Sequence, residues 1–245
     1  MSLLTIVQCA TDIIGLPRPT AVVTSTDQTV RTLFALVNRE GQNLARLRNT
    51  WGGGWTVLEK EHTFTTVADD EDYVFPADFG GLTFDTAWDR TTFFEMRGSL
   101  SPQQWQIARS GLVASPALRL RYRIKRGSGS SREFFIDPSP SGGDTLVYEY
   151  LSNQWVSNAA GDTFRTKFAA DDDVGLLDED LMEMGLVWRY KQSKGLAFAA
   201  ELAEYEIERD RRIGNDPGAT KVFVARRKFK LPPANVPITG FGGVT

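Results

Sequence analysis

The pentapeptide Trp51-Gly52-Gly53-Gly54-Trp55 separates two kinds of sequence pattern. Three consecutive glycines lower helix propensity by about 1 kcal/mol each relative to alanine, so they end the helical pattern that precedes them. From Thr56 to about Phe168, short segments alternate between apolar and polar residues, which is typical of β-strands. The pentapeptide therefore predicts that the chain passes here from helices into a mainly β region.

Two amphipathic helices are predicted before this boundary. Apolar residues recur every three or four positions from Leu3 to Ile14, and Gly15-Leu16-Pro17 ends that pattern. A second apolar face runs through residues 26–49, where Ser25 and Gln28 have the spacing of a capping box. The arginines between its apolar positions are expected on the wetter side of this helix: Arg31, Arg39, Arg46 and Arg48.

The β region contains its clearest strand at residues 118–125. Apolar residues alternate there with Arg119, Arg121, Arg123 and Lys125, so the basic groups share one face. Further strands are expected at 133–137 and 163–168, and a tight hairpin is expected from 145–151 and 154–157. Ser101-Pro102-Gln103-Gln104 has the residues of a helix start and predicts one short helix, to about Ser110.

Helical spacing returns after Asp171-Asp172-Asp173. One face, formed by Leu177, Leu181, Met184 and Trp188, predicts a helix to about Ser193 that begins with three acids. A further amphipathic stretch follows, and Gly214-Asn215-Asp216-Pro217-Gly218 ends it. Its expected buried face consists of Leu196, Ala199, Ala200, Ala203 and Ile207.

These elements predict an α+β fold. Two helices precede the β region and two follow it, and each needs a partner for its apolar face. We therefore expect an antiparallel helical bundle formed by residues 1–54 and 173–215, with a mainly β domain inserted at 55–172. Residues 216–245 are expected to form a C-terminal strand or extended arm, because the end is rich in Pro and Gly.

Few residues in the sequence can carry out chemistry. One cysteine, Cys9, excludes an intrachain disulfide framework, and one histidine, His62, leaves no readable nucleophile–base arrangement. The acidic runs at 69–72 and 171–173 lack the spacing of an EF-hand loop, so solvated turn acids are expected in preference to a metal site. No apolar run approaches the roughly 20 residues that span a bilayer. The sequence predicts no enzyme, no cofactor and no metal.

The charge is concentrated at the C-terminal end. The 245 residues carry a net charge of −3, yet residues 219–245 hold five basic groups and no acid. A Pro-rich arm is partly extended before it binds, so docking it costs less entropy than ordering a flexible coil. We expect the arm to bind a partner through four cations and one aromatic anchor: Arg226, Arg227, Lys228, Lys230 and Phe241.

The order of several motifs resembles the head-to-tail adaptor (connector) proteins of short-tailed bacteriophages. The resemblance spans most of the chain and has no catalytic signature. The segments that carry the resemblance are Gly15-Leu16-Pro17-Arg18-Pro19, the helix 26–48, Tyr73-Val74-Phe75-Pro76-Ala77-Asp78-Phe79, Trp88-Asp89-Arg90, Leu100-Ser101-Pro102-Gln103-Gln104-Trp105, the stretch 171–181, and Gly185-Leu186-Val187-Trp188-Arg189-Tyr190-Lys191.

The resemblance implies a structural virion protein at the head–tail junction, made in the cytoplasm of the bacterial host. Such proteins form a ring, dodecameric by resemblance, that binds the portal protein and carries distal tail (nozzle or fibre) proteins. The ring continues the DNA channel, so genomic DNA is expected only inside that channel. The helical part then packs against neighbouring copies, and the C-terminal extension reaches into the portal.

Two alternatives remain open at this point. One is a carbohydrate-binding tail or surface module, for which Trp51, Trp55 and Trp155 would supply exposed aromatic rings. The other is a cell-wall glycoside hydrolase that uses carboxylates of the β region, since the 31 acids of the chain allow such a pair without specifying one.

Overall fold

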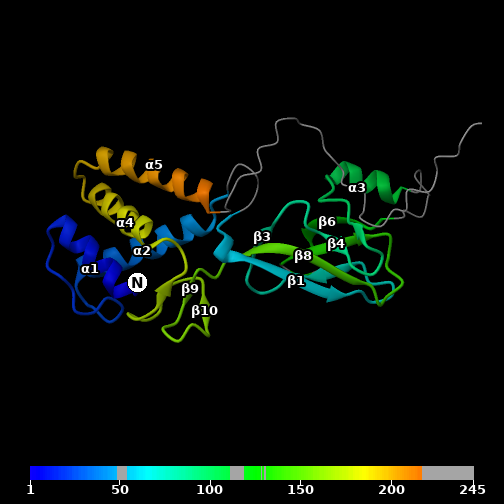
Figure 1. Cartoon of the computed structure of the whole chain (residues 1–245), viewed down its shortest axis with the longest axis horizontal. Helices are drawn as coiled ribbons and strands as arrows, with labels where there is room; N and C mark the ends of the chain where they lie inside the picture. Colours follow the sequence, from blue (N-terminus) through cyan, green and yellow to red (C-terminus); the bar gives the residue numbers. More distant parts are fainter. Residues whose placement is uncertain (49–53, 111–118, 128, 130, 217–245) are drawn as a thin grey trace, which may run out of the picture. The chain divides into compact units, whose positions relative to one another are not determined.

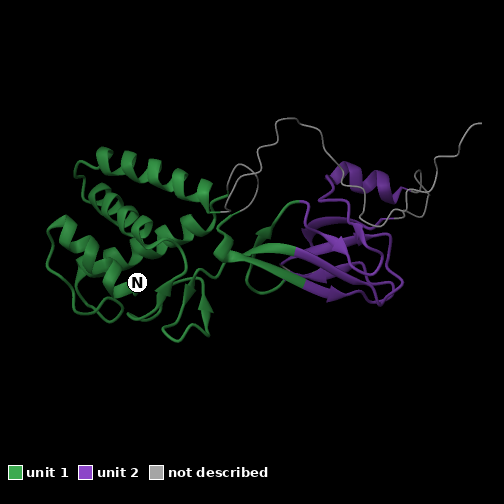
Figure 2. Ribbon diagram, viewed as in Figure 1, with its two compact units in different colours: residues 1–62, 76–84, 149–219 green, residues 63–75, 85–148, 220–245 purple. Residues whose placement is uncertain are grey.

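The computed structural model describes residues 1–48, 54–110, 119–127, 129 and 131–216. They form helices and antiparallel sheets, which confirms the mixed α+β class (Figure 1). The described residues divide into two compact units (Figure 2). Unit 1 comprises those of Met1–His62, Pro76–Phe84 and Glu149–Ala219, and unit 2 those of Thr63–Phe75 and Asp85–Tyr148. The domain boundaries predicted above stay a prediction.

The first helix, α1 (Leu3–Ile14), has the predicted bounds. The Ser2 side chain caps its first turn by accepting a hydrogen bond from the Thr5 N–H. Gly15 ends it with a left-handed φ of 79°, a conformation that costs glycine little because it has no Cβ. Local sequence signals at both ends therefore set this helix.

The second helix, α2 (Gln28–Ala45), is shorter than predicted and has a different cap. The predicted capping box at Ser25 is wrong, because the Asp27 carboxylate accepts hydrogen bonds from the N–H groups of Thr29 and Val30, at 2.7 and 3.1 Å. A carboxylate at this position also favours the positive end of the helix dipole. All four arginines expected on the wetter side are exposed: Arg31, Arg39, Arg46 and Arg48.

Two helices follow the strands, as predicted. Helix α4 (Glu179–Ser193) begins at Asp178, whose side chain accepts from the Leu181 N–H, and it contacts α1, α2 and α5 (Ala199–Asn215). In Figure 1, α4 lies between α5 and the other two helices of unit 1. The buried face predicted for α5 is wrong: its members Leu196, Ala199, Ala200, Ala203 and Ile207 are all exposed. Tyr205 and Ile213 are buried instead, because α5 turns Tyr205 toward Glu40 of α2.

The strands of the described residues form three sheets. The five-stranded sheet has the order β1 (Glu59–Thr65), β8 (Thr145–Ser152), β4 (Trp88–Asp89), β5 (Phe94–Glu95), and β3 (Phe79–Leu82) also pairs with β8. One three-stranded sheet has the order β2 (Asp72–Val74), β7 (Arg132–Asp137), β6 (Arg121–Arg126). The other has the order β10 (Phe164–Arg165), β9 (Val156–Ser157), β11 (Val174–Gly175). A short 3-10 helix, η1 (Thr56–Leu58), precedes β1.

The predicted tight hairpin of β8 and β9 is wrong. Strand β9 pairs with β10 and β11, whereas β8 pairs within the five-stranded sheet. Trp155, in the connection between them, is 1% exposed and packs edge-on against Phe168. Because this ring is buried in the core of unit 1, the segment that joins β8 to β9 does not form a hairpin turn. The strand expected at 163–168 is correspondingly short.

The short helix α3 (Pro102–Arg109) begins with the predicted capping box. The Gln104 N–H donates to Ser101 Oγ at 3.2 Å, and the Ser101 N–H donates to Gln104 Oε1 at 3.0 Å. Two N–H groups that the helix cannot satisfy itself are thus paired reciprocally.

Each unit has its own apolar core. In unit 1 the buried faces of α1, α2 and α4 meet Trp55 and Trp155. Gly41 of α2 lies under the Trp155 ring, and a Cβ atom at this position would overlap that ring. In unit 2 the core is aromatic, with ring centroids 4.8 to 6.1 Å apart: Phe64, Phe75, Tyr122, Phe134 and Tyr148.

Gly41→Ala tests the close approach of α2 to Trp155. Overpacking a buried site commonly costs about 1–3 kcal/mol, so we expect the free energy of unfolding to fall by that amount in urea titrations. Gly214→Ala is the matched control: it lies in α5 with open space around it and should raise stability by about 0.5–1 kcal/mol. Equal effects of the two substitutions would contradict the packing argument.

Candidate functional surfaces

Glu40 on α2 is a carboxylate with no solvent exposure. It accepts hydrogen bonds from Arg189 Nε of α4 and from the Tyr205 hydroxyl of α5. A Cβ atom at Gly185 would overlap the Glu40 side chain, so glycine leaves the room that the carboxylate occupies. Burial raises the pKa of Tyr205, and the negative charge of Glu40 is the second cause of this shift. The Tyr205 hydroxyl therefore keeps its proton and donates the hydrogen bond. This triad joins three helices and serves the fold.

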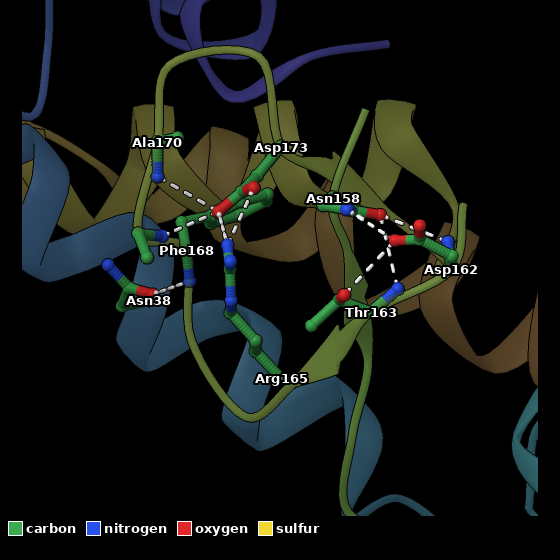
Figure 3. A network of polar contacts seen from close by, with 9 residues as sticks. Asn38, Asn158, Asp162, Thr163, Arg165, Phe168, Ala170 and Asp173 are labelled. Carbon is green, nitrogen blue, oxygen red and sulfur yellow. Dashed lines mark hydrogen bonds and ion pairs between the residues drawn. The ribbon is translucent and has the colours of Figure 1, made fainter. Parts of the chain in front are cut away.

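The acid Asp173 organises the loop before α4 (Figure 3). Its carboxylate is 1% exposed and accepts hydrogen bonds from Arg165 Nη1 at 3.0 Å and from the N–H groups of Ala169 and Ala170 at 2.6 and 2.9 Å. Nearby, Asn38 Oδ1 of α2 accepts from the Phe168 N–H at 2.9 Å. These bonds satisfy backbone groups that the loop itself cannot pair.

Asp171 has a similar structural role. Its carboxylate accepts hydrogen bonds from the N–H groups of Val22 and Val23, at 3.1 and 2.8 Å, and its backbone oxygen accepts from the Leu4 N–H. The expectation of solvated turn acids is therefore wrong for Asp171 and Asp173, because both carboxylates pair backbone N–H groups of the fold. Among the described residues, no group of three or more His, Cys, Asp and Glu side chains could hold a metal ion.

In the other acidic run, Glu71 connects to α3. Its oxygens accept hydrogen bonds from Arg109 Nη1 at 2.5 Å and from Ser139 Oγ at 2.7 Å. The hydrogen bond from Arg109 is the main reason that the pKa of Glu71 lies below its ordinary value, although partial burial opposes it. Glu71 therefore has a structural role in unit 2, where it links α3 to the loop that contains Ser139.

A cavity of about 440 Å³ opens at the start of α4. It is lined by Trp55, Val57, Gly175, Leu176, Leu177, Asp178, Glu179, Asp180 and Asp216. Its acids are already engaged: Arg212 pairs with Asp178 and Asp180, the N-terminal ammonium pairs with Glu179, and Asp216 accepts from the Thr56 N–H. Neither Cys9 nor His62 lines this cavity. The ion pairs of Arg212 join the start of α4 to the end of α5. The residues that line the cavity include no nucleophile with an adjacent base.

The two candidate nucleophilic or basic side chains lie on different elements. Cys9 is half-buried on α1, and His62 is half-buried on β1. Burial lowers the pKa of His62, and the negative charge of Asp78 opposes that shift. Their positions give no support to catalytic chemistry.

Two basic residues of β6, Arg121 and Lys125, contact the neighbouring strand β7. Arg121 Nη1 lies 3.8 Å from Asp137 of β7, and Lys125 Nζ lies 3.8 Å from the centroid of the Phe135 ring. Arg119, before the strand, lies over Phe94 at 5.4 Å. Cross-strand pairing and cation–π contacts account for these three cations without a nucleic acid.

Two of the three tryptophans proposed to form a carbohydrate platform, Trp55 and Trp155, do not lie at the surface. Trp55 is 4% exposed and donates its indole N–H to the Leu44 carbonyl at 2.9 Å, and Trp155 is 1% exposed. That expectation is wrong for both, because their large apolar rings fill the core of unit 1. Trp51 lies outside the described residues.

Sequence reasoning missed an exposed aromatic residue at the β4–β5 turn. Phe93 has a left-handed φ of 60° and is 68% exposed. The buried Asp89 carboxylate fixes this turn by accepting from the N–H groups of Thr91 and Thr92, at 2.9 and 3.1 Å. An aspartate followed by two threonines is a local turn signal that could have identified it.

The partner-binding residues predicted from the sequence lie outside the described residues: Arg226, Arg227, Lys228, Lys230 and Phe241. Within the described ranges, no helix is long and apolar enough to cross a membrane.

The sequence matches a protein-family model. A family model described as SU10 adaptor protein matches residues 1–224. No curated protein matches the sequence. The matched range covers both units of the structure.

Arg189→Met tests the triad around Glu40. Removing the guanidinium leaves a buried carboxylate without its charge partner, so we expect a loss of about 3–5 kcal/mol in the free energy of unfolding, measured by urea titration. The double variant Glu40→Met, Arg189→Met should regain much of it. Arg211→Met removes an exposed pair with Glu208 and is the control, with an expected loss below about 1 kcal/mol. Similar losses for the two arginines would contradict the role of burial.

A second prediction concerns pH. The folded-state pKa of Glu71 is depressed, so its contribution to stability is present above the unfolded-state pKa and is lost as pH falls through the folded-state value. We expect wild type to lose more stability between pH 6 and about pH 3 than Glu71→Gln, in urea titrations at each pH. Burial raises the pKa of Glu183, so Glu183→Gln should not reduce the loss of stability at low pH. Identical profiles for wild type and Glu71→Gln would refute this assignment.

Proposed function

We infer that this chain, which belongs to the SU10 adaptor protein family, is a head-to-tail adaptor of a bacteriophage. It would form a ring that binds the portal protein, carries the distal tail proteins and continues the channel for genomic DNA. The match of the family model over residues 1–224 is the observation that carries this proposal. Its place would be the head–tail junction of the virion.

The side-chain chemistry of the described residues supports a structural role. The acids Glu40, Glu71, Asp171 and Asp173 are each committed to arginine, hydroxyl or backbone donors of the fold. A catalytic carboxylate would instead need to face a space that a substrate can enter. Adaptor function requires only shape, surface chemistry and stable packing.

We further propose that the parts of the chain divide this work. The helical bundle, residues 1–54 and 173–215, would pack against neighbouring copies, and the β domain inserted at 55–172 would face outward. The arm, residues 216–245, would reach into the portal, with Arg226, Arg227, Lys228 and Lys230 attracted by an acidic surface and Phe241 buried as the anchor. Twelve copies would close the ring, as the resemblance implies.

Truncation of the arm tests this proposal. Deleting residues 231–245 should leave thermal unfolding nearly unchanged and abolish binding to the purified portal protein of the same phage, measured by sedimentation. Phe241→Ala should weaken binding by on the order of 2 kcal/mol, because a buried aromatic anchor contributes that much. Val244→Ala is the matched control in the arm and should bind like wild type.

Electron microscopy of the wild-type complex provides the second readout. We expect a ring of adaptor copies on the portal. A truncated protein that binds with unchanged affinity would overturn the arm hypothesis, and the absence of a ring on the portal would overturn the adaptor proposal itself.

A further inference from the structure

One side of α5 is apolar and, among the described residues, exposed. Ile207 is 71% exposed and Leu196, just before the helix, is 52% exposed. Ala200 and Ala203 lie on the same side as Ile207, at spacings of seven and four residues, and both are exposed. Tyr205 points to the opposite side, into the triad with Glu40. We call the outward side, with Ala200, Ala203 and Ile207, the α5 face.

Carboxylates border the α5 face on both sides. Glu204 and Glu206 lie about 100° of helix rotation to either side of Tyr205, so they flank the α5 face. Both are exposed, and neither has an ion pair within the described part of the chain. Arg211, four residues after Ile207, is exposed on the same side, so the border of the α5 face is mainly acidic and contains one arginine. An apolar centre with a polar border is the arrangement of a protein-binding face.

The exposed side of α2 has the opposite charge. Arg31, Ala35 and Arg39 follow one another at four-residue spacing, and Arg46 continues the line after seven residues. All four are exposed, and the ion pairs of the described ranges include none of the three arginines. We call this side the α2 face. Its centre is a small alanine, and its ends are basic.

The two faces cannot meet within one copy. Helix α4 lies between α2 and α5 and contacts both (Figure 1). Glu40, on α2, turns toward α4 and α5, so the α2 face points away from α5. An apolar, acid-bordered face and a basic face thus lie on different sides of the same unit. This placement permits one copy to bind the next.

We propose that the α5 face of one copy binds the α2 face of a second copy, head to tail. Ile207 and the alanines pack around Ala35, and the arginines of the α2 face meet Glu204 and Glu206 of the α5 face. Contact between two different faces is heterologous, and repeated heterologous contact closes a ring when the rotation permits. The proposal rests on the ring function proposed above and identifies the surfaces that build it.

Thiol cross-linking between two variants tests the pairing. In full-length protein with Cys9→Ser, one preparation carries Ala203→Cys and the other carries Ala35→Cys. A short bismaleimide should join the mixed preparations into a covalent dimer, in solution and on the portal, and should join neither variant to itself. Ile13→Cys, on an exposed site of α1, replaces Ala35→Cys in the control mixture and should give about tenfold less dimer.

Charge reversal gives an independent readout of the same contact. Arg39→Glu in the Ala35→Cys chain should lower the dimer yield about three- to tenfold, and Glu206→Arg in the Ala203→Cys chain should restore it. Ile207→Asp should also lower the yield, whereas Ile13→Asp should leave it unchanged, because both isoleucines are exposed on helices but only one lies on the α5 face.

Three outcomes would overturn the pairing. These are dimers formed by Ala203→Cys alone, a yield equal to that of the Ile13→Cys control, and a ring on the portal without the mixed cross-link. In the last case the ring proposal stands and only the assignment of faces fails. Conversely, a mixed dimer without a ring on the portal would support these faces and refute the adaptor proposal.

Discussion

The helices of unit 1 are organised around one buried charge. Glu40 is fully buried, so the hydrogen bonds of its carboxylate depend on donors supplied by the protein. Arg189 comes from α4 and Tyr205 from α5, and both must be in place at once. Gly185 provides the space, since any side chain there would overlap the carboxylate. This requirement fixes how α4 and α5 are rotated about their own axes, and therefore which of their faces are left outside.

The same logic explains the acidic turn before α4. Asp171 pairs the N–H groups of Val22 and Val23, which are distant in sequence. Asp173 pairs those of Ala169 and Ala170 in its own loop, and Asn38 adds a bond to the Phe168 N–H. These bonds hold the connection from the strands to α4 against α1 and α2. Two of the three aspartates in this run, Asp171 and Asp173, are in this way engaged by the fold.

The rotation of α5 connects stability with the proposed assembly. Because Tyr205 must reach Glu40, the side with Ala200, Ala203 and Ile207 faces outward. An apolar outward face is costly in an isolated chain and useful in an assembly, where a second surface covers it. The packing of the core thus decides which surface is available to another copy.

The sequence alone determined the elements whose signals are local. The ends of α1 and the capping box of α3 depend on residues within a few positions, and the N-cap of α4 is the acid that begins its helical pattern. Only the tertiary structure decided which strands pair and which helix faces are buried. Strand β9 follows Trp155 into the core instead of pairing with β8, and α5 buries Tyr205 instead of its alanines. Both outcomes depend on partners more than a hundred residues away, Gly41 and Glu40, and no local pattern of hydrophobicity contains that information.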